Sequence, residues 1–337
     1  MKRASKSRPS KTSKQTALSP KIVAIGGGSG IPNILRGLKN YTTDISAIVT
    51  MMDSGGSAGR LRDEFGYLPT GDTRRVLVAL SPDDRSSLIL RQLFNYRFSK
   101  GQGLEGHSFG NLFLTALREI TGGDDKAVTA AGKLLGIKGS VLPVTLTNSH
   151  LMARLEDGKI LAGEANIDVR KEPADVPIDY VYLDPKAYAY KPAIAAIQNA
   201  EVIVLGPGDL YTSIIPNLLV EGIAEAINFS RAPKVFICNI MTKHGESDGF
   251  KASDFIREIR HYLDGDLDYV VINKSMFPAK ILQRYAKEKA FPVEVNLAAC
   301  KKLAKNIIVR DLAVQDTLVR HEDGKTARVI IDIATRN

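Results

Sequence analysis

Tryptophan is absent from the 337 residues, and aromatic side chains make up only 7% of them. Because single-stranded nucleic acids are held on stacked aromatic rings, this shortage argues against a nucleic-acid platform, and we expect no specific nucleic acid partner. Cysteine is also scarce. The chain has two, Cys238 and Cys300, which lie far apart and lack the spacing of metal ligands. Cys238 follows the apolar run 235–237, which predicts a buried core thiol rather than a nucleophile.

Long hydrophobic runs are missing too. No segment is long enough and apolar enough to cross a bilayer, and the N-terminus has no apolar segment of the kind found in secretory signals. We therefore expect a cytoplasmic protein without a membrane span. With 44% hydrophobic residues in the chain, residues 21–337 are expected to bury one core as a single domain.

Acidic residues are absent from the first twenty positions, which contribute six of the nine net positive charges. A basic, serine-rich stretch with few apolar side chains cannot form a core, so residues 1–20 are predicted to be a disordered tail. The small remaining charge of the body does not indicate a nucleic acid or a membrane surface as partner.

Short apolar runs alternate with helical patterns along most of the chain. The expected strands are 21–25, 45–50, 201–205, 234–238, 269–273 and 292–295. The expected helices are 31–38, 71–80, 87–98, 108–120, 126–135, 218–229, 252–263 and 278–289. This alternation predicts an α/β protein with a mainly parallel sheet and helices on both faces. Residues 139–184 instead contain short strand-like pieces and the turn signal Asp157-Gly158, so we expect a small antiparallel insertion there.

Three glycine-rich loops directly follow predicted strands. They are 26–30, 53–62 and 206–208, and each comes after a run of buried β-branched character. Glycine loops expose backbone N–H groups, and a helix N-terminus behind such a loop attracts anions. Because the carboxyl ends of parallel strands share one edge of a sheet, the three loops predict one cleft for a phosphate-bearing ligand.

Charged and polar side chains accompany these loops. Arg60 and Arg62 offer guanidinium groups suited to phosphate oxygens. Asp72 is predicted to cap a helix, and Arg74 follows in its first turn, where an anion would offset the unfavourable helix dipole. Other polar groups lie near a helix start or a strand end: His107, Asn111, Asn239 and Thr242. The alternative to a ligand-binding role is that the arginines are solvated at the surface and that His107 makes a structural hydrogen bond.

In this order the motifs resemble the gluconeogenesis-factor (YvcK-type) family, relatives of 2-phospho-L-lactate transferase CofD. The matching segments are 26–30, 53–62, 71–74, 106–111, 206–219, 239–249 and 320–323. The resemblance implies a modified Rossmann-like core and a cytoplasmic protein needed for growth on gluconeogenic carbon and for cell shape. It also implies a bound nucleotide sugar, best represented by UDP-N-acetylglucosamine, with Arg320 against it.

The loops and the resemblance together give the candidate ligand-binding residues. They are Gly27, Gly28, Ser29, Gly30, Asp53, Ser54, Gly55, Gly56, Arg60, Arg62, Asp72, Arg74, His107, Asn111, Gly206, Gly208, Asp209, Tyr211, Thr212, Ser213, Asn239, Thr242 and Arg320. The chain departs from the family at Asp53-Ser54, where paired acids or an acid and an amide are usual. Asp53 is therefore the one metal ligand we predict, and Mg²⁺ the one candidate cofactor.

Three functions stay open on these residues. We favour a binding protein that holds a nucleotide sugar and reports its presence to cell-wall synthesis or carbon-metabolism proteins, and we expect it to be a homo-oligomer. The second is a metal-dependent transferase of the 2-phospho-L-lactate transferase type, in which Asp53 would be catalytic. The third is NAD binding, which is weaker because the 26–30 loop lacks the third fingerprint glycine at its usual spacing.

Overall fold

The computed structural model describes residues 19–170, 174–315 and 318–336. The predicted disordered tail lies outside the described residues, apart from its last two positions. Among the described helices, none combines the length and the apolar character needed to cross a bilayer.

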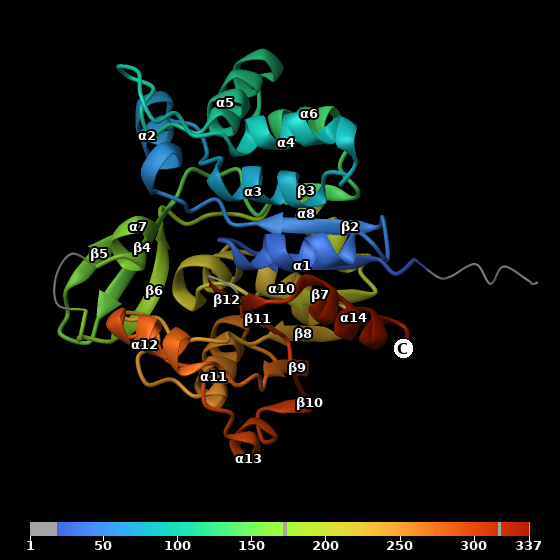
Figure 1. The fold of residues 1–337 in the computed structure, drawn as a ribbon, viewed down its shortest axis with the longest axis vertical. Helices are drawn as coiled ribbons and strands as arrows, with labels where there is room; N and C mark the ends of the chain where they lie inside the picture. The colour runs from blue at the N-terminus through green and yellow to red at the C-terminus, as the bar shows by residue number, and fades with distance from the viewer. Residues whose placement is uncertain (1–18, 171–173, 316–317, 337) are drawn as a thin grey trace, which may run out of the picture.

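A seven-stranded sheet forms the centre of the described chain (Figure 1). Its order is β10-β9-β8-β7-β1-β2-β3, and every neighbouring pair is parallel. The strands are β1 Ile22–Gly26, β2 Ile45–Val49, β3 Ser140–Pro143, β7 Val202–Leu205, β8 Lys234–Ile237, β9 Leu267–Asn273 and β10 Ala304–Arg310. The predicted α/β class is confirmed, and β1 lies between β2 and β7, so the loops after all three strands are neighbours.

Helices cover both faces of this sheet. One apolar cluster joins the sheet to α1 Gly30–Leu38, α3 Gly71–Leu80, α5 Phe109–Thr121, α6 Asp124–Leu135 and α14 Asp323–Ala334. The other joins it to α8 Lys191–Gln198, α9 Ile215–Leu218, α10 Ile223–Phe229 and α11 Ala252–Leu263. The remaining helices are α2 Gly56–Phe65, α4 Arg85–Asn95, α7 Glu164–Asp168, α12 Ala279–Lys287, α13 Leu297–Cys300 and the π-helical turn η1 Leu210–Ile214. Both faces are therefore buried, which explains the continuous apolar runs of the strands.

The packing of α1 shows how local sequence sets this arrangement. Ile31, Ile34, Leu35 and Leu38 recur with helical period and are fully buried against the sheet. On the neighbouring face, a Cβ atom at Gly37 would lie 2.2 Å from the carbonyl oxygen of Asp323. Only glycine permits so close an approach, and it lets α14 pack directly on α1. The segment before α14, which contains Arg320 and His321, lines the same cavity as Ser29 and Gly30 at the start of α1.

A smaller antiparallel sheet lies beside the main one, at the left of Figure 1. It has the order β5-β4-β6, with β4 His150–Leu155, β5 Ile160–Ala162 and β6 Ile178–Asp184. The predicted turn is present, because Gly158 has a φ of +87° and the N–H of Lys159 donates to Asp157 Oδ1 at 3.0 Å. The antiparallel part begins at His150 rather than near residue 139, since β3 pairs parallel with β2 in the main sheet.

Two details of the prediction were wrong. Residues 292–295 are not a strand, because only the isolated bridges of Pro292 with Met241 and of Glu294 with Lys251 form there. The last strand of the sheet is instead β10, which the sequence pattern did not reveal. As an edge strand it is only partly buried, so its apolar residues do not form an uninterrupted run. A third, two-stranded sheet pairs β11 Ala313–Gln315 with β12 Val319–His321.

Candidate ligand-binding site

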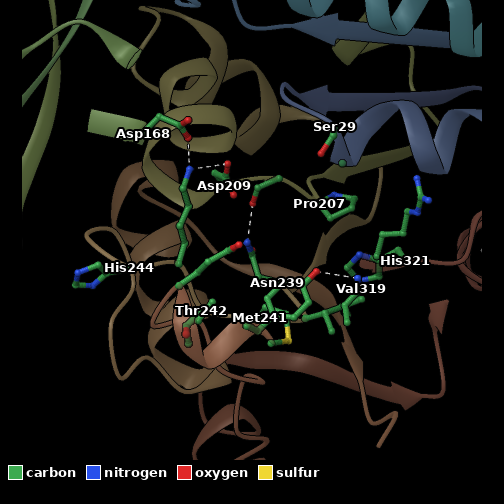
Figure 2. Close-up of a pocket in the computed structure, with 18 of the residues that line it drawn as sticks. Ser29, Asp168, Pro207, Asp209, Asn239, Met241, Thr242, His244, Val319 and His321 are labelled. Carbon is green, nitrogen blue, oxygen red and sulfur yellow. Dashed lines mark hydrogen bonds and ion pairs between the residues drawn. The ribbon is translucent and has the colours of Figure 1, made fainter. Parts of the chain in front are cut away.

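A cavity of about 630 Å³ opens at the carboxyl edge of the central sheet. The loops after β1, β7 and β8 form its floor, β12 forms one wall, and α7 of the antiparallel part forms the opposite wall. Figure 2 shows the side chains from these segments converging on the same space. Seven of the predicted site residues line it: Ser29, Gly30, Gly208, Asp209, Asn239, Thr242 and Arg320. We call this space the main chamber.

The glycine loop after β1 makes close contacts with neighbouring loops. A Cβ atom at Gly30 would lie 2.1 Å from the carbonyl oxygen of Pro207, so the loops after β1 and β7 touch there. Gly28 has a φ of +64°, and its N–H donates to Asp72 Oδ2 at 3.0 Å. Asp72 thus binds the glycine loop and is not the helix cap that we predicted, since the N-cap of α3 is Thr70. Ser29 and Gly30, at the start of α1, remain open to the chamber.

The hydroxyl-rich segment after Gly208 faces away from the main chamber. In η1, the N–H of Tyr211 and the hydroxyl of Thr212 both donate to the carboxylate of Glu246, each at 3.1 Å. Ser213 is buried below the glycine loop and packs against Gly28 and Gly208. These three residues therefore lie beneath the floor of the chamber and do not contact its interior.

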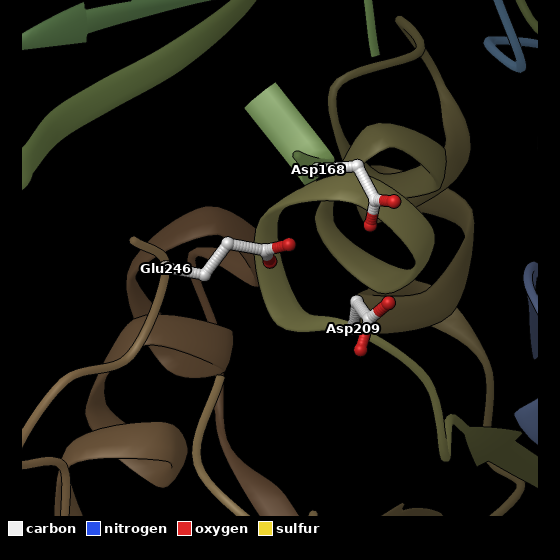
Figure 3. Close-up of side chains that lie close together, drawn as sticks. All are labelled: Asp168, Asp209 and Glu246. Atoms are coloured by element: carbon white, nitrogen blue, oxygen red, sulfur yellow. The ribbon is translucent and has the colours of Figure 1, made fainter. Parts of the chain in front are cut away.

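A lysine and three carboxylates cluster at one end of the main chamber. Lys243, Asp168 and Asp209 line it, whereas Glu246 is buried and does not. Asp168, Asp209 and Glu246 have oxygen atoms within 4.8 Å of one another (Figure 3). The ammonium of Lys243 forms ion pairs with Asp209 and Glu246, both at 2.9 Å, and with Asp168. Figure 2 labels Asp168 and Asp209, and its dashed lines mark their ion pairs with Lys243. We call these four residues the lysine–carboxylate cluster.

Burial perturbs the acids and bases of this cluster. Desolvation raises the pKa of Glu246 to about 7, although Lys243 opposes the rise. Desolvation alone would lower the pKa of Lys243, but the three carboxylates raise it above its ordinary value. The ammonium is thus firmly charged and takes the place that a cation would need among these carboxylates. Lys243 and Glu246 lie three residues apart in the segment 239–249, but neither was among the candidate residues chosen from the sequence. Asp168 reaches them from the distant α7.

The wall formed by β12 carries Arg320 and His321. Arg320 is exposed and lines the chamber. His321 is buried, and burial lowers its pKa to about 4, so its imidazole is neutral at physiological pH. The hydroxyl of Tyr285 in α12 accepts the N–H of Val319 at 2.8 Å and holds β12 in place. This wall therefore presents one cation and one neutral ring to the chamber.

A second cavity, of about 430 Å³, lies on the other side of α7. We call it the side chamber. It shares Asp168 and Val169 with the main chamber, and five predicted residues line it: Asp53, Gly55, Gly56, Arg74 and Asn111. Arg75, Arg97 and Glu164 complete its polar lining. The sequence predicted one continuous cleft, whereas the structure has two chambers separated by α7.

The side chamber contains the predicted metal ligand. Burial and the neighbouring Asp72 raise the pKa of Asp53, whose Oδ1 accepts the N–H of Gly55 at 2.9 Å. Glu164, which the sequence analysis did not select, lies next to this loop and accepts the N–H of Ser54 at 3.4 Å. Burial, and then Asp53 and Asp168, raise the pKa of Glu164 to about 8. Asp53 and Glu164 are therefore the carboxylates of this chamber that Mg²⁺ could use, and only after Glu164 loses its proton.

Several predicted residues line neither chamber. They are Gly27, Gly28, Ser54, Arg60, Arg62, Asp72, His107, Gly206, Tyr211, Thr212 and Ser213. Arg62 is only 3% exposed and donates to Asn148 Oδ1 and to the Ser149 carbonyl, so it ties α2 to the antiparallel part. Arg60 donates to the Glu105 carbonyl at 3.0 Å, and His107 lies 3.2 Å from the Ser57 hydroxyl. The contact of His107 is the structural one considered as its alternative, whereas Arg62 is buried and bonded within the protein rather than solvated.

Comparison with known proteins identifies a family over most of the chain. The family model of 2-phospho-L-lactate transferase CofD matches residues 22–313. The gluconeogenesis factor of Halalkalibacterium halodurans is 42% identical over 314 residues, which cover 92% of this chain and 95% of that protein. The gluconeogenesis factor of Bacillus subtilis is 40% identical over 318 residues, with 93% and 98% covered. The chain belongs to the gluconeogenesis-factor family, which is related to CofD.

Solved structures agree with this assignment. A crystal structure of a protein from Bacillus halodurans is similar to this chain with a TM-score of 0.88 and 42% sequence identity. The match covers 93% of this chain and 99% of that one. The fold that carries the main chamber therefore also occurs in a protein whose crystal structure is known.

Proposed function

We propose that this gluconeogenesis-factor family member is a cytoplasmic regulatory protein that binds a nucleotide sugar, such as UDP-N-acetylglucosamine, in the main chamber. One observation carries the proposal. The start of α1, the loop at Gly208 and Arg320 border the same cavity of about 630 Å³, at the carboxyl edge of a parallel sheet. A cavity of this size suits a ligand of nucleotide-sugar dimensions, since ligand pockets span about 300–1,000 Å³.

The chemistry of the lining fits the parts of such a ligand. Backbone N–H groups at Ser29 and Gly30 and the guanidinium of Arg320 suit a diphosphate. The carboxylate of Asp209 and the amide of Asn239 lie nearby and suit hydroxyl groups of ribose or sugar. The Asn239 amide N–H donates to the Gly208 carbonyl at 2.8 Å, while its Oδ1 has no hydrogen-bond partner among the described residues. An unpaired acceptor beside the cavity favours a ligand that bears hydrogen-bond donors.

The regulatory part of the proposal rests on the family and on the lysine–carboxylate cluster. Relatives carry the name gluconeogenesis factor, which supports a role in growth on gluconeogenic carbon. We extend the proposal to cell shape, with cell-wall synthesis or carbon-metabolism proteins as partners. In the main chamber, the ammonium of Lys243 lies among the carboxylates that a catalytic metal would need, which favours binding over turnover.

A transferase of the CofD type is the second candidate, supported by the family model and by Asp53 and Glu164 in the side chamber. Incubation with Mg²⁺, a nucleotide-activated donor and hydroxyl acceptors distinguishes the two candidates. We expect no nucleotide release above background. Sustained turnover that disappears in Asp53→Asn would replace the regulatory proposal by the enzymatic one.

The binding test uses titration calorimetry with UDP-N-acetylglucosamine and with NAD. Arg320→Ala should weaken binding of the nucleotide sugar by about ten- to a hundredfold, because a charge-assisted hydrogen bond contributes roughly 1.5–3 kcal/mol. Arg310→Ala is the matched control, since Arg310 is an exposed arginine on β10 that does not line the main chamber. Tighter binding of NAD than of the nucleotide sugar, or equal affinities of the two variants, would contradict the assignment.

A further inference from the structure

The side chamber contains a buried guanidinium without an acidic partner. Arg74 is 8% exposed, and its Nε donates to Asn111 Oδ1 at 3.1 Å. Its Nη1 donates to the Phe94 carbonyl at 3.2 Å and to Asn95 Oδ1 at 3.0 Å. All three acceptors are neutral, and among the described residues no carboxylate lies within ion-pair distance of Arg74. A buried charge of this kind is unfavourable unless a counter-ion joins it.

Two further arginines increase the positive charge around Arg74. Burial, and then Arg75 and Arg97, lower the pKa of Arg74 to about 10, so it is still protonated at physiological pH. Arg75 pairs with Asp72, whose other oxygen accepts the N–H of Gly28. Arg97 donates one N–H to the Gly106 carbonyl at 2.6 Å and also lines the chamber. Three guanidinium groups therefore meet at one end of a cavity of about 430 Å³.

The acids around the side chamber offset this positive charge only in part. Asp53 and Asp72 attract Arg74, but in the described part of the chain neither forms an ion pair with it. The carboxylate of Glu164 accepts the N–H of Ser54 and, among the described residues, forms no ion pair with an arginine. Asp168 is paired with Lys243 on the other side of α7. The hydrogen bonds from Arg74 to Asn111 and Asn95 fix the plane of its guanidinium, while no hydrogen bond is recorded for its Nη2 within the described part of the chain. One edge of the fork is thus held by protein and the other is left for a ligand.

We propose that the side chamber binds a small phosphate-bearing dianion, either free phosphate or the phosphate group of a small metabolite. Arginine forks bind tetrahedral phosphate oxygens with paired, charge-assisted hydrogen bonds, and Arg74 cannot obtain such a bond from the protein. The start of α2 at Gly55 and Gly56 borders the same space and adds the positive end of a helix dipole. The protein then has two ligand sites that meet at Asp168 and Val169. The idea that the second ligand lies beside a nucleotide sugar rests on the proposed function, but phosphate binding itself does not.

Titration of the full-length protein with inorganic phosphate, followed by calorimetry and by ³¹P NMR line width, tests the proposal. We expect saturable binding that Arg97→Ala weakens by about tenfold. Arg60→Ala is a closely matched control, because Arg60 also donates one bond to a loop carbonyl but does not line the side chamber. Its phosphate affinity should stay within about twofold of the unsubstituted protein. Arg74→Lys keeps the charge but loses the fork, and we expect it to weaken binding at least as much as Arg97→Ala.

The titration is repeated with saturating UDP-N-acetylglucosamine, and then with glycerol 3-phosphate in place of phosphate. We expect phosphate to bind equally well beside the nucleotide sugar. Tighter binding of glycerol 3-phosphate identifies a phosphate ester as the ligand, whereas tighter binding of phosphate identifies the free ion. No saturable binding, unchanged affinity in both arginine variants, or competition with the nucleotide sugar would overturn the proposal. Phosphate binding without any binding of the nucleotide sugar would refute only the proposed function.

Discussion

Replacing Lys243 by methionine would remove the ammonium that lies among three carboxylates. The side chain of Glu246 is 1% exposed, whereas Asp168 and Asp209 are 31% and 43% exposed. Removing one partner of a buried ion pair costs about 3–5 kcal/mol, but exposed pairs contribute about 0–1 kcal/mol each. Because Tyr211 and Thr212 still donate to Glu246, we expect the free energy of unfolding to fall by about 3 kcal/mol at pH 8.

The loss of stability in this variant should depend on pH, because Glu246 titrates near neutral pH. The pKa of Glu246 in the folded protein, about 7, lies above its ordinary value of 4.5. The folded state therefore holds this proton more tightly, and the contribution of Glu246 to stability falls as the pH rises from 4.5 to about 7. Without Lys243 the pKa rises further, so the penalty for ionising Glu246 extends to higher pH. The variant should lose more stability at pH 8 than at pH 6, where Glu246 is mostly protonated in both proteins.

Urea unfolding followed by circular dichroism at pH 6 and pH 8 measures both quantities. Lys325→Met is the control, because Lys325 pairs only across an exposed contact of 3.2 Å with Asp311 and should contribute less than about 1 kcal/mol. A loss in Lys243→Met that is the same at both pH values, or no larger than that of the control, would refute the role assigned to the lysine–carboxylate cluster.

Two other substitutions test residues that the sequence and the structure assign differently. Arg62→Ala should lower the free energy of unfolding by about 1–3 kcal/mol, because it leaves the carbonyl of the buried Ser149 unpaired and removes the hydrogen bonds to the exposed Asn148. Calorimetry should give an unchanged affinity for UDP-N-acetylglucosamine, and a tenfold loss of affinity would show instead that Arg62 contacts the ligand. Glu164→Gln should raise the free energy of unfolding more at pH 9 than at pH 6. Folding raises the pKa of Glu164 from 4.5 to about 8, so the stability lost to its carboxyl group accumulates between these two pH values and levels off above them. Urea unfolding at the two pH values checks this, and a pH-independent effect would contradict it.

Much of the fold follows from patterns that extend over a few residues. The apolar runs at 21–25, 45–50 and 201–205 became β1, β2 and β7, because strands buried on both faces need continuous apolar sequence. The glycine loops behind them were recognisable because positive φ angles and close backbone approach require glycine. The turn at Asp157-Gly158 is equally local, since its hydrogen bonds join neighbouring residues. For such features the sequence alone was sufficient.

The candidate site depended on contacts between distant segments, which no local pattern reports. Strand order brings the loops after β2, β1, β7 and β8 to one edge of the sheet, but α7 separates the Asp53 loop after β2 from the main chamber. Glu164 and Asp168 reach the site from the antiparallel part, although their own sequence resembles any short surface helix. Arg62 and Arg74 both follow glycine loops and both donate to neutral acceptors, yet Arg62 lies between α2 and the antiparallel part while Arg74 borders the side chamber. The sequence determined which groups are available for binding, but tertiary packing decided which of them are already used, because only packing determines whether a buried charge has a partner.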